Sequence, residues 1–246
     1  MKKIILILSV ISVLISSCGK DDNKVKQVRL KTYTHEFYER SPSSVDKYTI
    51  EYNSANKISK VLLDTNGTLC QTLTCVYNSS NILDSIVERN AAGIMTYYYK
   101  IGWTGDKITS TNSTQHTYNS DGFVDRKTYS DGSYFRNVYG GDSIKLYYKD
   151  VSTPEVLRGT YKLSSTIKNP FLIAGFEKEA YTTGLLFYYN NALNALLPFI
   201  ETAEAGYFVK NYTFVGDFKG YPLQRNDLTN SLPNNRSKET FTYEEF

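Results

Sequence analysis

Aromatic side chains are the residues of this sequence whose type and spacing best suit ligand binding. Tyrosine accounts for 22 of the 246 residues, and tyrosines are adjacent at 97–99, 147–148 and 188–189. Such rings supply rigid contact area with a polar tip, so an exposed row of them would stack on sugars or contact a partner protein. We therefore predict ligand-binding roles for Tyr98, Trp103 and Tyr148, with burial in the core as the alternative. Trp103 is expected in a lengthened turn that spans residues 102–106.

The sequence lacks the spacings that catalysis and metal binding need. His35 and His116 are far apart and no Cys-His pair accompanies them, so we predict no metal and no cofactor. Each histidine is expected on a half-exposed strand face. A Gly-x-Ser-x-Gly nucleophile elbow and a glycine-rich phosphate loop are both missing. We predict that the protein is not an enzyme. A surface polysaccharide hydrolase is an alternative, because two of the 25 acidic residues could face each other across a cleft.

The N-terminal segment is typical of an exported lipoprotein. Two lysines precede an apolar run at residues 4–15, and small residues then lead directly to Cys18. Twelve helical residues cover about 18 Å, which is short of the roughly 30 Å hydrocarbon core of a membrane. The segment resembles a bacterial lipobox, which implies cleavage before Cys18 and acylation of its thiol and of the new amine. Several acyl chains give a stable membrane anchor. An ordinary signal peptide with an incidental cysteine is the alternative.

The chain divides at this cysteine. We predict a signal peptide at 1–17, an acylated Cys18 with a polar tether to residue 26, and one tyrosine-rich β domain at 27–246. The net charge of +3 includes the two lysines of the signal peptide, so no basic field is left for a nucleic-acid partner. The Lys-Asp-Asp stretch at 20–22 resembles the signal that carries Bacteroidetes lipoproteins to the outer face of the outer membrane. This predicts a lipid-anchored outer-membrane protein that faces the cell exterior.

A short phrase recurs along the domain and predicts a repeated hairpin. In its clearest copies an alternating run ends in Tyr-Asn, turn-forming residues follow, and an apolar residue returns six positions after the tyrosine; these pairs are Tyr52 and Ile58, Tyr77 and Leu83, and Tyr118 and Val124. Weaker copies lead from Tyr99 to Ile108 and from Tyr139 to Ile144. Neighbouring hairpins should pair edge to edge. The predicted fold is therefore all-β, an antiparallel meander of repeated hairpins that forms a curved sheet or a barrel.

These repeats carry a family resemblance. The stretch Tyr-Asn-Ser-Asp-Gly-Phe-Val at 118–124 looks like a degenerate tyrosine-aspartate (YD) repeat. Together with an Asn-Pro-Phe segment at 169–171, a Gly-Tyr-Pro turn at 220–222 and a tyrosine-rich last strand, the chain resembles a Bacteroidetes lipoprotein domain of unknown function with a porin-like fold. The resemblance covers roughly residues 27–246. It implies an architecture and a cellular address, and it implies no activity.

One segment departs from the strand pattern. Leucines and an isoleucine fall at helical spacing near 185–197, and Pro198 ends the run, so we predict one short helix there. The helix is expected to plug the core, with a lid over a ligand site as the alternative.

The predicted function combines the anchor with the aromatic residues. We expect a lipid-anchored surface protein, attached to the membrane by its N-terminal acyl chains, that binds a glycan or a surface protein without catalysis. A transmembrane β-barrel is a further alternative. It is disfavoured because Glu244 and Thr242 share the register of Phe246, whereas a lipid-facing row is apolar at every second residue.

Overall fold

The structure is a computed structural model, and it describes residues 26–38, 43–112, 114–168, 170, 200–205, 208–229 and 235–246. These residues form strands β1 to β16: Val28–Phe37, Ser44–Tyr52, Ile58–Thr65, Thr68–Tyr77, Leu83–Asn90, Met95–Thr104, Lys107–Thr111, Thr114–Tyr118, Val124–Thr128, Tyr134–Gly140, Ser143–Lys149, Val156–Leu163, Ile200–Ala205, Phe208–Phe218, Tyr221–Thr229 and Asn235–Glu245. The helix predicted near 185–197 lies outside the described residues. No helix within the described ranges is long and apolar enough to span a membrane.

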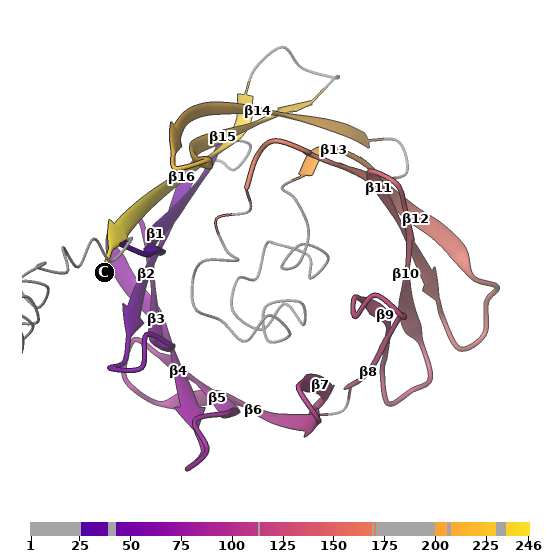
Figure 1. The fold of residues 1–246 in the computed structure, drawn as a ribbon, viewed down its shortest axis with the longest axis horizontal. Coiled ribbons are helices and arrows are strands. Elements are labelled where there is room, and N and C mark those ends of the chain that lie inside the picture. The colour runs from indigo at the N-terminus through magenta and orange to yellow at the C-terminus, as the bar shows by residue number, and fades with distance from the viewer. Residues whose placement is uncertain are drawn as a thin grey trace, which may run out of the picture.

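The strands close into a barrel. Each strand pairs antiparallel with its neighbours in the chain, and β1 pairs with β16 over the register from Val28 opposite Glu245 to Phe37 opposite Ser237. Figure 1 shows the resulting ring of strands, viewed end on. The predicted all-β antiparallel meander of hairpins is confirmed. Of the two forms left open by the sequence, the strand pairing selects the barrel.

Alternation along the strands sorts side chains between the inside and the outside of the ring. In β2, for example, Asp46, Tyr48 and Ile50 are buried while the residues between them are partly or fully exposed. Successive strand residues point to opposite faces, so one face of each strand lines the interior. The buried apolar residues of β1 to β7 and β16 form the larger core cluster: Leu30, Tyr33, Tyr48, Ile50, Ile58, Val61, Leu73, Cys75, Leu83, Ile86, Ile101, Ile108 and Phe241.

An asparagine side chain organises four of the described turns. The Asn78 Oδ1 accepts hydrogen bonds from the backbone N–H groups of Ser80 and Ile82, both at 3.0 Å. Asn53, Asn90 and Asn119 accept the same pair of bonds, from the residues two and four positions later. Asn81 adopts a φ of 58°, a left-handed conformation that asparagine tolerates better than most residues. The Tyr-Asn phrase is therefore the start of a side-chain-supported turn.

Aromatic donors join each hairpin to the one before it. We call them the aromatic ladder: Tyr52, Tyr77, Trp103, Tyr118, Tyr139 and Tyr243 donate, in that order, to the backbone carbonyls of Leu30, Ile58, Leu83, Ile108, Val124 and Pro222, over 2.5–2.8 Å. In four hairpins a register shift falls at the ladder residue. Most of the acceptors are the apolar residues that open a return strand, and Ile58, Leu83 and Ile108 are fully buried. The repeat therefore encodes a belt of linked, buried residues near one end of the barrel.

The two ends of the β domain meet at the same end of the barrel as this belt. The Gln27 N–H donates to the Phe246 carbonyl over 3.2 Å, and the Phe246 N–H donates to the Gln27 carbonyl over 3.0 Å. Tyr243 of β16 and Leu30 of β1 then occupy the ladder positions that a hairpin would supply. The seam between β16 and β1 thus repeats the geometry of the other hairpins without a covalent turn.

Candidate functional site

The structure places Trp103 in the wall of the barrel and not in a turn. Strand β6 continues to Thr104, and the reversal falls at Gly105 and Asp106, so the lengthened turn predicted for 102–106 is wrong. The indole packs against the larger core cluster, and its Nε1–H donates to the Leu83 carbonyl over 2.7 Å. An indole thus fills the ladder position that tyrosine holds in the other hairpins. Its ring packs in the barrel wall, so the geometry favours the core alternative for Trp103.

Tyr98 and Tyr148 lie on opposite faces of the barrel wall. Tyr98 faces outward on β6 and is 44% exposed, whereas its neighbours Tyr97 and Tyr99 contact each other at 4.4 Å between ring centroids on the other face of the strand. Tyr148 lies on β11, half-buried against Phe135 at 4.8 Å between centroids. Strands β6 and β11 are not neighbours in the barrel. The three aromatic candidates therefore do not form one site, and their roles in binding stay predictions.

Cys18 and the predicted signal peptide lie outside the described residues. The structure describes the predicted tether only at Lys26. The domain boundaries at residues 17 and 26 and the acylation of Cys18 stay predictions.

A buried ion pair joins β15 to β16 beside the seam of the barrel, and sequence reasoning did not find it. The Arg225 guanidinium on β15 donates from Nε and Nη to the two Glu239 oxygens on β16, over 2.5 and 2.6 Å, and both side chains are almost wholly buried. The Tyr33 hydroxyl on β1 donates to the same carboxylate over 3.1 Å. Burial alone would lower the pKa of Arg225, but the adjacent Glu239 carboxylate outweighs it and raises that pKa above its usual value. The pair is a structural element, since β15 supplies Arg225, β16 supplies Glu239 and β1 supplies the Tyr33 hydroxyl.

Both histidines are buried, which corrects the prediction of a half-exposed face. His35 is 8% exposed and His116 is 4% exposed. Desolvation, together with the charge of Lys127 opposite it on β9, lowers the pKa of His116 to about 4. The imidazole is therefore neutral at physiological pH. The signal that the sequence did contain was the position of His116 two residues before the ladder residue Tyr118, on the same inward face.

Three of the four buried carboxylates of the described residues have hydrogen-bond partners in the barrel wall that the structure shows directly. Asp46 accepts a hydrogen bond from the Thr65 hydroxyl at 2.7 Å, and Glu88 accepts one from Thr96 at 2.8 Å. Glu239 is held by Arg225. Within the described ranges, no three His, Cys, Asp or Glu side chains gather closely enough to hold a metal ion.

The outer face of the barrel carries ion pairs between neighbouring strands. On the side formed by β16 and β1 to β6, basic side chains pair with carboxylates: Arg29 with Glu244, Lys238 with Glu36, Lys60 with Glu51, and Lys100 with Asp84. Threonines and further lysines alternate with them, among them Thr32, Thr34, Lys47 and Thr49. An outer wall of this kind suits water. A lipid-facing wall would instead show an apolar band along every strand.

Comparison with known proteins gives a likeness of structure only. No protein-family profile matches the sequence, and no curated protein sequence matches it. A porin-like protein from Bacteroides uniformis ATCC 8492 is similar over 87% of this chain and 96% of its own, at 14% identity and a TM-score of 0.49. A porin-like protein from Bacteroides vulgatus ATCC 8482 is similar over 89% and 99%, at 11% identity and a TM-score of 0.41. Such identities are too low to transfer a function.

Proposed function

We propose that this chain is a lipid-anchored outer-membrane protein that displays a water-facing β-barrel on the cell surface and binds a glycan or a protein there without catalysis. The observation that carries the proposal is the polar outer wall. Ion pairs such as Arg29 with Glu244 and Lys60 with Glu51 lie on the strand face that a transmembrane barrel would turn to lipid. Lys47, midway along β2, is exposed on the same face, and a charged side chain at the bilayer midplane costs about 2–4 kcal/mol, which argues against the transmembrane alternative.

The position of the chain ends supports anchoring at one end of the barrel. Gln27 and Phe246 are joined by backbone hydrogen bonds at the ladder end. Gln27 lies nine positions after Cys18, and nine steps of extended chain reach at most about 32 Å. Acyl chains on Cys18 would therefore hold the ladder end near the membrane. The opposite end and the outer wall would then be accessible to a ligand.

A non-catalytic role fits the chemistry of the described residues. A glycosidase needs two carboxyl groups about 5–10 Å apart on either side of a bound sugar. The buried carboxylates Asp46, Glu88 and Glu239 are instead engaged by hydroxyl or guanidinium donors of the wall itself.

Two cysteine variants of the full chain test the anchor. We expect Cys18→Ala to abolish incorporation of labelled palmitate. Because this change also prevents cleavage and keeps the apolar run at 4–15 attached, solubility is tested on a chain of residues 19–246, which should stay in the aqueous fraction without detergent. Cys70→Ala is the matched control, because Cys70 is an exposed free thiol on β4, and this variant should stay labelled and membrane-bound. A chain of residues 19–246 that still needs detergent would restore the transmembrane alternative.

Glycan arrays and pull-downs with surface proteins test the binding role of the released barrel. Protease treatment of intact cells tests its exposure on the outside. Wild-type protein that is digested only after the outer membrane is broken would place the barrel in the periplasm and contradict surface display.

A further inference from the structure

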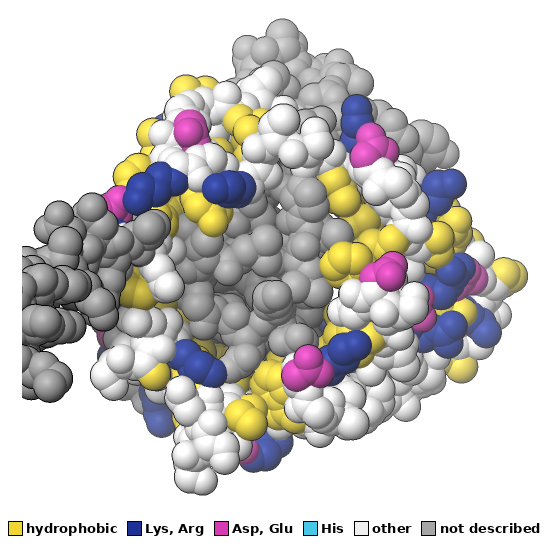
Figure 2. Space-filling view, viewed as in Figure 1, with side chains coloured by type: hydrophobic (Ala, Val, Ile, Leu, Met, Phe, Trp, Pro, Cys, Tyr) yellow, Lys and Arg dark blue, Asp and Glu magenta, His cyan; other side chains and the backbone are white. Residues whose placement is uncertain are grey.

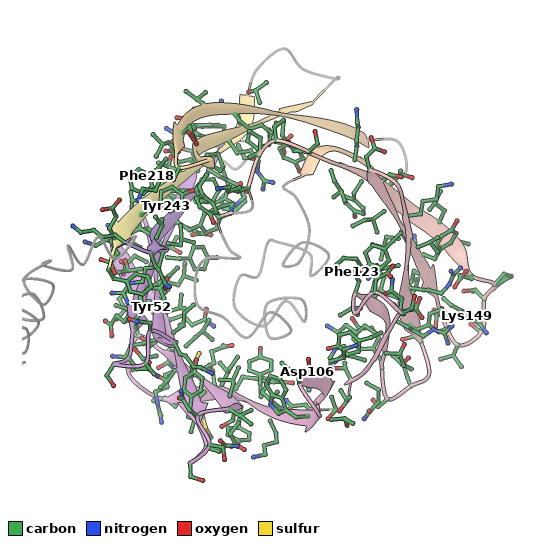
Figure 3. The ribbon with its side chains drawn as sticks, viewed as in Figure 1. Tyr52, Asp106, Phe123, Lys149, Phe218 and Tyr243 are labelled. Carbon is green, nitrogen blue, oxygen red and sulfur yellow. The ribbon has the colours of Figure 1, made fainter. Side chains whose placement is uncertain are left out.

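One side of the barrel carries an unusual concentration of outward-facing basic side chains. We call it the basic wall: Arg126 on β9, Arg136 on β10, Lys145 and Lys149 on β11, and Lys162 on β12. Their direction follows from the strand register. Ile144 is fully buried, so Lys145 and Lys149 alternate to the outside, and Arg136 lies opposite both Arg126 and Tyr147. Figure 3 shows Lys149 on the outer side of the wall, and Figure 2 shows Lys and Arg side chains gathered along this edge.

The charges of the basic wall are less compensated than those on the rest of the barrel. On β16 and β1 to β6, lysines and arginines pair with carboxylates of neighbouring strands. On the basic wall Arg136 pairs with Glu155, whereas Arg126, Lys145, Lys149 and Lys162 form no ion pair within the described part of the chain. Asp125 is the acidic residue on these strands, Glu155 directly precedes β12, and Asp131, Asp142 and Asp150 lie in the turns at the strand ends. The wall therefore presents a net positive surface to solvent.

Tyrosine rings hold the two guanidinium groups in place. Arg126 lies over the Tyr134 ring at 4.3 Å from its centroid, and Arg136 lies over the Tyr147 ring at 4.7 Å. Lys149 lies opposite Tyr134 in the strand pairing, and its Nζ is 6.0 Å from the centroid of the same ring. Stacking fixes the plane of a guanidinium. The Nε and Nη edge of Arg136 is bound by the Glu155 carboxylate. The buried Nε of Arg126 has no hydrogen-bond partner among the described residues.

The shape of the basic wall suits an elongated anion. Lys162 lies opposite Ser143, at the ladder end of β11, and Lys149 lies at the far end of that strand. Six residues of strand cover about 20 Å, so the charges extend along the barrel height. If the ladder end faces the membrane, a flat lipid surface would reach only the lower part of such a row. A flexible polymer with repeated acidic groups would contact all of it.

We propose that the basic wall binds an acidic polysaccharide through its carboxylate or sulfate groups. This inference rests on the proposed surface function and specifies the class of ligand. The stacked guanidinium group of Arg126 would form charge-assisted hydrogen bonds with the anionic groups, and Arg136 would do so where the polymer displaces Glu155. Lys145, Lys149 and Lys162 would add point charges along the polymer. Glu155, which occupies Arg136, would oppose binding.

Binding of three polymers to the full-length protein in non-ionic detergent tests the inference. The polymers are polygalacturonate, which carries carboxylates, dextran sulfate, which carries sulfates, and neutral dextran. We expect binding to at least one acidic polymer, weakening with added salt, and none to dextran. The triple variant Arg126→Gln, Lys145→Gln, Lys149→Gln should weaken acidic-polymer binding by about tenfold or more, since each lost charged contact removes a charge-assisted bond.

Two further variants distinguish a loss of binding contacts from a loss of folded protein. The control Lys31→Gln, Lys47→Gln, Lys60→Gln removes the same charge from β1 to β3 and should change binding less than about twofold. Glu155→Gln frees Arg136 and should strengthen binding, a gain that a misfolded protein cannot produce.

The inference is overturned if neither acidic polymer binds, or if both triple variants weaken binding equally. It is also overturned if the basic-wall variant affects only association with phosphatidylglycerol vesicles, which would make the wall a lipid contact. Neither result touches the proposed function, whose anchor is tested separately at Cys18.

Discussion

At Trp103 an indole takes the place of the tyrosine that the other hairpins use. Its Nε1–H reaches the Leu83 carbonyl as the Tyr77 hydroxyl reaches the Ile58 carbonyl, over 2.7 and 2.8 Å. Burial of such a hydroxyl keeps it protonated, since desolvation raises the pKa of Tyr139 to about 12. The ladder residues are thus permanent donors to carbonyls that water does not reach easily.

A pair of substitutions separates this hydrogen bond from ring packing. Trp103→Tyr supplies a donor where the repeat normally has one, and Trp103→Phe supplies none. We expect Trp103→Phe to be less stable than Trp103→Tyr by about 1 kcal/mol, measured by urea unfolding. Tyr98→Phe is the control: it removes a hydroxyl that points outward and should leave the urea midpoint of unfolding unchanged. Equal midpoints for the two Trp103 variants would remove the structural role of the donor.

His116 makes stability depend on pH in a defined direction. Its pKa is about 4 in the barrel and about 6.5 when unfolded, so the unfolded chain takes up the proton first as the pH falls. This contribution is complete above about pH 6.5 and is lost progressively toward pH 4. The loss reaches about 3 kcal/mol, since each pKa unit corresponds to about 1.4 kcal/mol. The difference in unfolding free energy between wild type and His116→Gln should follow this curve. A difference that is constant from pH 7 to 4 would contradict a buried, neutral imidazole.

At the scale of the element, the hairpin is specified by its asparagine more than by its glycines. The Asn78 side chain accepts two backbone N–H groups within the turn between β4 and β5. Without this side chain, both backbone N–H groups would need water as their hydrogen-bond acceptor when the turn forms. The same device recurs at Asn53, Asn90 and Asn119, which explains why the repeat is recognisable although its remaining letters vary.

Replacing one turn asparagine tests this role. Asn78→Ala should lower the free energy of unfolding by about 1–2 kcal/mol, because it removes two side-chain acceptors. Ser79→Ala, in the same turn, has an exposed side chain and should change stability by less than about 0.5 kcal/mol. Thermal denaturation followed by circular dichroism measures both. Equal effects would mean that composition, and not the asparagine acceptor, supports the turn.

At the scale of the whole molecule, closure depends on the seam where β16 meets β1. The Arg225–Glu239 pair and the Tyr33 hydroxyl link β15, β16 and β1. Buried ion pairs contribute little relative to apolar residues of the same volume, but a single charge left behind is costly. The pair therefore favours the observed strand register over other registers, which would leave one of the two charges buried without its partner.

The buried pair predicts that substitutions at Arg225 and Glu239 have strongly non-additive effects on the free energy of unfolding. Glu239→Gln should cost about 3–5 kcal/mol because it leaves Arg225 buried beside a neutral amide. The double variant Arg225→Met, Glu239→Leu should cost less than Glu239→Gln alone, since no charge remains. Glu51→Gln breaks the exposed pair with Lys60 and should cost less than about 1 kcal/mol. Urea unfolding of the four proteins checks the order, and a double variant less stable than Glu239→Gln would refute the argument.

The sequence by itself determined the local structure, because the information for it is local. Period-two alternation and the Tyr-Asn turns predicted hairpins whose return strands begin at Ile58, Leu83 and Val124, as the structure has them. The tertiary structure decided what depends on contacts between distant residues: the closure of β16 on β1, the pairing of Arg225 with Glu239, and the burial of His116. It also placed Trp103 in the aromatic ladder and gathered the basic side chains of β9 to β12 on one wall. A strand pattern specifies two faces, and only the closed ring settles which face is inside.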